Sequence, residues 1–177
     1  MTDQRWEMIE LLRDTGAAFA DRVEALEEEQ WLAAPAPGEW SPAAIAEHVT
    51  LVEVGTGKLI ARKLFAEPAT ETDLASARQK EASLLARAAS REDKLVAPDF
   101  VTPTGRWPDR SELLATFQTH REMVIVQLSD PTRDLRRFAA PHPLLGPLDA
   151  WQWGMFLGLH LKRHLNQLEE GLTRQPA

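Results

Sequence analysis

The stretch from Trp153 to His164 reads WGMFLGLHLKRH, and it decides the fold. Its apolar residues recur at spacings of three and four, which is typical of the buried face of a helix. His160 and His164 lie four residues apart, so their imidazoles project from the same face, one turn from each other. On a helical wheel Trp153 and Leu168 share this face, whereas Lys162 lies opposite. We therefore expect both histidines to face the interior of the protein.

A pair of histidines at this spacing can be metal ligands or simply hydrogen-bonded core residues. A third histidine favours the interpretation as metal ligands over that as core residues. Ser41 and Pro42 have the residue types of a helix N-cap and first position, and they predict a helix in which His48 points inward with Ile45. Three histidines from two helices can hold a metal ion and leave a coordination position for water or substrate. That arrangement is typical of catalytic rather than structural sites.

The composition limits the class of protein. The 177 residues suit one domain, residues 1–177, and the absence of cysteine excludes disulfides, thiolate ligands and a cysteine nucleophile. A formal net charge of −7 without a basic stripe argues against nucleic acid as a partner. The amino terminus lacks the pattern of a secretory signal, and no apolar stretch is long enough to span a bilayer. We expect a cytoplasmic protein that does not bind membranes.

The helical periodicity predicts an all-α domain of four main helices, with no strand. The connection between the second and third helices is long enough to cross the bundle, and it contains a minor helix. The expected main helices cover about residues 3–30, 41–67, 109–130 and 148–172, with the minor helix at 74–89 and a terminator at Gly171.

Three local patterns give the chain a family resemblance. They are WSP at 40–42 leading to AEHV at 46–49, HPLLGPL at 142–148, and HLKRHLNQL at 160–168. With its helix order, the chain resembles the DinB-like superfamily of metal-dependent four-helix-bundle proteins. The resemblance implies that His48, His160 and His164 bind a divalent metal ion, zinc or nickel.

The resemblance also bears on activity. Characterised relatives include thiol-dependent S-transferases and an isomerase that use low-molecular-weight thiols such as bacillithiol or mycothiol, and many relatives are homodimers. We therefore expect a metal-dependent enzyme, with thiol S-transfer to a small-molecule substrate as its reaction and a homodimer as its assembly. The family name records induction by DNA damage and not DNA binding.

The residues alone leave other functions open. Metal-activated water would make the protein a hydrolase, and the same site can serve non-catalytic binding of a metal or small ligand. A scaffold with a vestigial site that binds a partner is a third alternative. A zincin protease is not supported, because Leu161 stands where that motif needs glutamate after His160. Three nitrogen ligands suit zinc, nickel, copper and iron alike.

Four further residues are candidates for a pocket beside the histidines. His120 can be a pocket residue or general base, Trp153 a pocket wall, Gln167 an orienting group and Gly55 a space for substrate. Each also has a structural interpretation, as a core residue, a buried hydrogen-bond donor or a helix-packing position.

Three other polar residues are expected to lie outside the site. Glu47 and Glu53 point away from His48 on the helical wheel, so we expect them to be solvated. His142 lies in a proline-flanked turn and is expected to be structural or exposed. No catalytic residue is assigned.

Overall fold

The computed structural model describes residues 2–89 and 97–174, and it is mostly helical, as the sequence predicts. The four long helices are α1 Thr2–Glu24, α3 Pro42–Leu59, α5 Arg110–Ser129 and α6 Ala150–Leu172. A further helix of similar length is α4 Glu71–Ala89. The shorter elements are α2 Glu28–Leu32, the π-helical turn η1 Ile60–Leu64, the 3-10 turn η2 Asp99–Val101, and strands β1 Ala139–His142 and β2 Gly146–Asp149.

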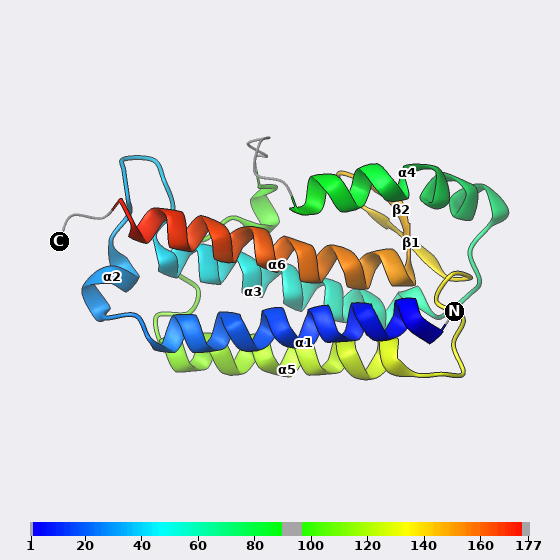
Figure 1. Cartoon of the computed structure of the whole chain (residues 1–177), viewed down its shortest axis with the longest axis horizontal. Coiled ribbons are helices and arrows are strands. Elements are labelled where there is room, and N and C mark those ends of the chain that lie inside the picture. The colour runs from blue at the N-terminus through cyan, green and yellow to red at the C-terminus, as the bar shows by residue number, and fades with distance from the viewer. Residues whose placement is uncertain (1, 90–96, 175–177) are drawn as a thin grey trace.

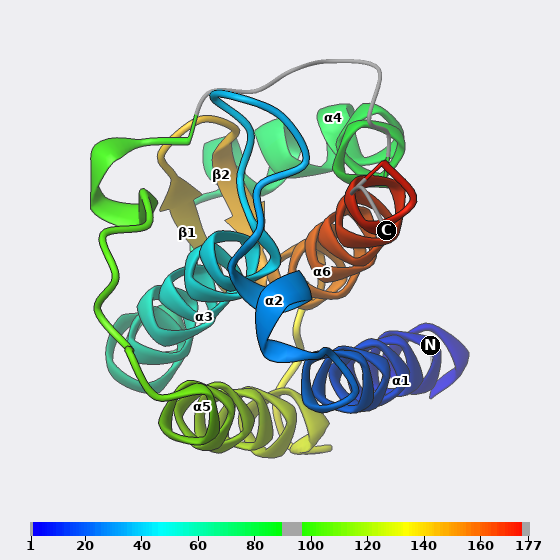
Figure 2. The same cartoon turned by 90° about the vertical axis from the view of Figure 1, so that its left-hand side faces the viewer.

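The four long helices lie side by side along the long axis of the molecule. α1 and α6 run in one direction and α3 and α5 in the other (Figure 1). Seen end-on, α1 contacts α5 and α6, and α3 contacts the same two helices from the opposite corner (Figure 2). Helix α4 lies on the outside against α6 and β2. This arrangement places α3 and α6, which carry the three histidines, next to each other.

Local sequence signals begin the two histidine-bearing helices. The Ser41 side chain accepts the N–H of Ala44 at 3.3 Å, and Pro42 occupies the first turn of α3. Asp149 accepts the N–H of Gln152 at 2.8 Å, and the Gln152 side chain in turn accepts the N–H of Asp149 at 3.2 Å. This capping box fixes the start of α6 and therefore the register of both of its histidines.

The buried apolar residues form two clusters, one toward each end of the long helices. Between them lies a buried ion pair. Arg121 of α5 donates two hydrogen bonds to the Glu53 carboxylate of α3, at 2.8 and 2.9 Å, and a third to the carbonyl of Leu12 in α1 at 2.7 Å. Glu53 is 1% exposed, so the prediction that it is solvated is wrong.

The prediction that the chain contains no strand is also wrong. β1 and β2 pair antiparallel with Ala139 opposite Asp149 and His142 opposite Gly146. Gly146 has a φ of +71°, in the left-handed region that tight hairpin turns require and glycine tolerates. The hairpin brings His142 back against α6 immediately before that helix begins.

Three helix boundaries differ from the expected ones. The first helix ends at Glu24, and α2 follows as a separate turn with its own capping box between Glu27 and Gln30. α3 changes at Ile60 into η1. Gly171 lies inside α6 rather than beyond it, where it packs on Pro35. Within the described residues, no helix is both long and apolar enough to cross a membrane.

Candidate metal centre

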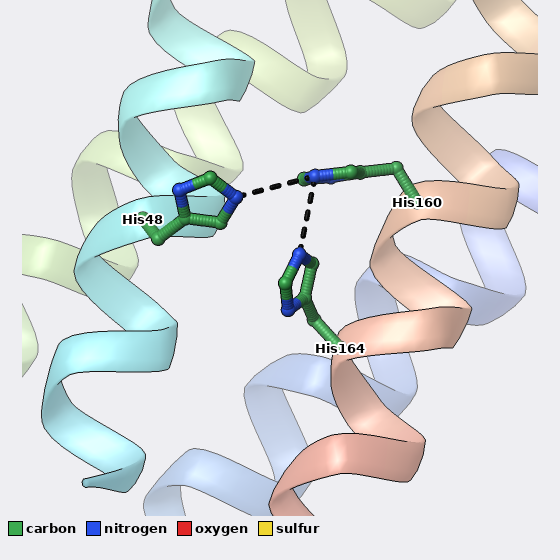
Figure 3. Close-up of side chains that lie close together, drawn as sticks. All are labelled: His48, His160 and His164. Carbon is green, nitrogen blue, oxygen red and sulfur yellow. Dashed lines mark hydrogen bonds between the residues drawn. The ribbon is translucent and has the colours of Figure 1, made fainter. Parts of the chain in front are cut away.

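The three predicted histidines meet between α3 and α6. His48 reaches the pair from α3, while His160 and His164 project from successive turns of α6 (Figure 3). The Nε2 atom of His160 lies 3.3 Å from Nε2 of His48 and 3.2 Å from Nε2 of His164. One ring nitrogen of each histidine lies within 4.8 Å of the other two. The three rings therefore present the same atom, Nε2, to one point.

These separations fit a divalent metal ion. Imidazole nitrogens bound tetrahedrally to zinc at about 2.0–2.1 Å are separated from each other by about 3.3 Å. Hydrogen bonding alone accounts for the contacts less well. A neutral His160 has at most one proton on Nε2, so it donates to His48 or to His164 but not to both. A cation at the common point satisfies all three lone pairs.

Neighbouring acceptors hold two of the rings in the tautomer that a metal needs. The Nδ1–H of His48 donates to the carbonyl of Val101 at 2.8 Å, and the Nδ1–H of His164 donates to Oε1 of Gln167 at 2.9 Å. A proton on Nδ1 leaves the lone pair of Nε2 exposed toward the other rings. Such outer hydrogen bonds orient metal-binding histidines and increase their basicity.

Burial favours the neutral form of His48 and His160. It lowers the pKa of His48, although the hydrogen bond to Val101 opposes the shift. The pKa of His160 lies well below its ordinary value near 6.5, first because the ring is buried and then because His164, His48, Arg163 and His142 are close. Neutral imidazoles are the form that binds metals, so protonation of these two rings does not compete with a metal near pH 7.

Aromatic rings surround the cluster. Trp40 packs on His48 with ring centroids 5.0 Å apart, and Phe156 packs on His160 at 5.3 Å. Phe156 also contacts His142 of the hairpin at 4.7 Å. Through Phe156, which lies one helical turn before His160, the hairpin thus places a fourth histidine near the three-histidine cluster. The proline-flanked sequence around His142 did not reveal this position.

The four predicted pocket residues differ in where they lie relative to the three histidines. Gln167 lies at the centre, as described above. Trp153 is buried, and its ring packs on His142 and Phe156; among the described residues no ring contact joins it to the three histidines. Gly55 is exposed rather than on the inward face where its spacing from His48 placed it.

His120 lies away from the three histidines of the candidate metal centre. Its Nδ1 would be 3.0 Å from a Cβ atom at Gly57, so it packs against that part of α3. Gly57 follows His48 by nine residues, which is half a revolution around the helix and about 13 Å along it. The structure therefore does not bring His120 into the metal centre. Its buried Nδ1 has no hydrogen-bond partner among the described residues, and burial lowers its pKa.

The expectation that Glu47 is solvated is wrong. Only 4% of this residue is exposed, and its carboxylate accepts backbone N–H groups from Thr104, Gly105 and Arg106. The segment that follows η2 covers the face of α3 on which Glu47 lies. A helical wheel gives the direction of a side chain but not what covers that face, so the sequence of α3 alone could not locate this contact.

Two surface hollows lie elsewhere on the molecule. Their lining residues are charged or polar for the most part, and neither hollow includes one of the three histidines. One is lined by Leu74, Arg78, Glu81, Arg136 and Asp149, and the other by Glu24, Arg110, Ser111, Leu114, Ala115 and Gln118.

Comparison with known proteins identifies the family. The model of the DinB superfamily matches residues 11–168, which include all three histidines. The chain belongs to the DinB superfamily. It is also similar to the uncharacterized protein YuaE of Bacillus subtilis (strain 168), with 24% identity over 150 residues that cover 85% of this chain and 88% of YuaE. No solved structure matches it significantly. The DinB resemblance inferred from the three motifs is confirmed.

Proposed function

We propose that His48, His160 and His164 bind one divalent metal ion, zinc or nickel, and that this DinB protein is a metal-dependent enzyme. The observation that carries the proposal is the convergence of three Nε2 atoms at separations of 3.2 and 3.3 Å. Three ligands leave at least one coordination position open, as in catalytic rather than structural zinc sites.

Thiol-dependent S-transfer is the reaction class that we propose for this site. The three imidazoles are neutral ligands and leave the full charge of the ion in place. The chemistry supplied by such a centre is acidification of a water or a thiol that takes the remaining position. The chain has no cysteine, so the reacting thiol comes from a second small molecule.

The chain's own residues would orient and shield this reaction. The carbonyl of Val101 and the amide of Gln167 hold the rings of His48 and His164. Trp40 and Phe156 pack on the rings of His48 and His160 and line this side of the site with aromatic surface. Fixed ligands would hold the ion in place, and aromatic walls would remove part of the water shell of an anion bound to it, which would make that nucleophile more reactive.

The scaffold that we propose is the DinB-like four-helix bundle. The packing of α1, α3, α5 and α6 supports it, and the connection that carries α4 would be the crossover between the second and third bundle helices. A homodimer is proposed from the family resemblance, and sedimentation equilibrium of the full chain tests it.

Metal analysis of the full chain, purified without an affinity tag, tests the centre. We expect about one zinc or nickel ion per chain in the unmodified protein and loss of most of it in a His160→Ala variant. A His120→Gln variant is the matched control, because His120 lies on another helix and outside the cluster. Equal metal content in the unmodified protein and His160→Ala would rule out the centre.

Thiol reactivity tests the reaction class. The metal-loaded protein would be incubated with monochlorobimane and bacillithiol, mycothiol or glutathione in turn. A thiol-dependent rate that disappears in His160→Ala supports S-transfer. Metal binding with no rate for any thiol would instead favour hydrolysis or non-catalytic binding.

A further inference from the structure

Glu47 and His48 are consecutive residues of α3 that hold the same loop. The Glu47 carboxylate accepts the N–H groups of Thr104 at 2.8 Å, Gly105 at 2.8 Å and Arg106 at 3.1 Å. The hydroxyl of Thr104 adds a longer contact at 3.4 Å. Successive backbone N–H groups that converge on one anion form a nest, and here the anion is a side chain of the protein itself.

The other end of this loop contacts the metal centre. Val101, the last residue of η2, is 8% exposed, and its carbonyl accepts the Nδ1–H of His48 at 2.8 Å. Successive residues of a helix project about 100° apart. The segment 101–106 therefore wraps around α3 and is fixed at both ends, by His48 at Val101 and by Glu47 at residues 104–106.

We propose that Glu47 is a positioning residue of the metal centre: by holding residues 104–106 it keeps the carbonyl of Val101 where it fixes the Nδ1–H tautomer of His48. This inference rests on the proposed metal centre. Binding of the ion and order of the loop are then coupled, and the coupling is reciprocal. Glu47 itself contacts neither the ion nor a substrate.

Substitution Glu47→Gln tests the role without a change of side-chain size. The amide presents an NH2 group to backbone N–H donors, so it cannot accept all three hydrogen bonds. We expect the zinc dissociation constant of the full chain, measured by competition with a chromophoric chelator, to rise about 10-fold, the lower end of the range for lost outer-sphere contacts. Glu53→Gln is the matched control, since it is the same substitution at a buried position of the same helix and should leave zinc affinity unchanged.

Gly105 allows the same contact to be weakened from the loop. Its φ of +77° strains any other residue, and a Cβ atom there would meet nothing within 4 Å. Gly105→Ala therefore perturbs the loop backbone without a clash, and we expect it also to weaken zinc binding. The double variant should lose little more than Glu47→Gln alone, because both changes break one contact.

Hydrogen exchange supplies a readout that does not depend on activity. Zinc should slow exchange of the amides of residues 104–106 in the unmodified protein and have little effect on them in Glu47→Gln. If the unmodified protein binds no zinc, the proposed metal centre itself is overturned. If the unmodified protein binds zinc, and Glu47→Gln and Gly105→Ala bind it with the same affinity, only the positioning role of Glu47 is overturned.

Discussion

His142 is a titratable residue that the hairpin places beside the metal centre. Its Nδ1 accepts the N–H of Leu144 at 3.1 Å, which in the neutral ring leaves the proton on Nε2. Burial, and after it the positive charge of Lys80, lower the pKa of His142 to about 4. At neutral pH the residue is therefore an uncharged hydrogen-bond donor near His160.

This pKa has a consequence for stability. Between pH 6.5 and 4 the unfolded chain binds a proton at His142 that the folded chain does not, so the free energy of unfolding falls as the pH is lowered through this window. A shift of this size contributes at most about 3 kcal/mol. In His142→Asn, whose Oδ1 can still accept from Leu144, we expect a shallower loss between pH 6.5 and 4.5. Urea denaturation of the metal-free proteins across that range measures it, and identical slopes would contradict the assigned pKa.

At the level of single residues, the sequence located the three histidines of the candidate metal centre but not the residues that hold them in place. His48, His160 and His164 could be found because helical spacing puts them on inward faces that the apolar residues define. Glu47 and Glu53 were misplaced because α3 is covered on several sides, by α6, by α5 and by the loop after η2. A polar residue on such a helix can be buried where another segment supplies its hydrogen-bond partner. The partners of Glu47 and Glu53 lie more than fifty residues away in sequence.

At the level of elements, α6 packs against other helices with two different faces. One carries the histidines toward α3, and the other carries Gly154 and Gly158 toward α1. A Cβ atom at Gly154 would lie 2.2 Å from the sulfur of Met8 and 2.9 Å from a methyl group of Leu128. Met8 and Leu128 are fully buried and have nowhere to move. Glycine at this position therefore sets how closely α1 and α6 approach.

A pair of glycine substitutions separates packing from helix propensity. Gly154→Ala should destabilise the protein by about 1–3 kcal/mol, the usual cost of overpacking a core. Gly55→Ala should stabilise it by up to about 1 kcal/mol, because Gly55 is exposed within α3 and alanine is the better helix former. Thermal and urea unfolding measure both. Similar effects of the same sign would show that the α1–α6 contact is not tight.

The elements that the sequence missed are short. β1 and β2 have four residues each and contain Pro141 and Pro147, so no alternation of apolar and polar residues can be recognised. The long helices were predicted because several turns of apolar periodicity define each one. The break after Glu24 escaped notice because Leu26 follows Val23 by three residues, as the apolar spacing of a continuous helix requires, and is buried.

At the level of the whole molecule, two polar centres connect the four long helices. The Glu53–Arg121 pair joins α3 to α5, and through the carbonyl of Leu12 it also joins α1. The three histidines join α3 to α6. Glu53 follows His48 by five residues, about 140° around α3, so the two centres lie on different sides of that helix.

The two centres should contribute independently to stability. In Glu53→Gln, Arg121 keeps a buried charge without its carboxylate, and we expect a loss of about 3–5 kcal/mol. Zinc at 100 times its dissociation constant should add about 2.7 kcal/mol, because it binds only the folded chain. Since the histidines do not contact Glu53 or Arg121, we expect the increment from zinc to be equal in the unmodified protein and in the variant. Urea unfolding of both proteins, with zinc and with chelator, measures the four free energies. An increment that shrinks in Glu53→Gln by more than about 0.5 kcal/mol would mean that α3 transmits strain from one centre to the other.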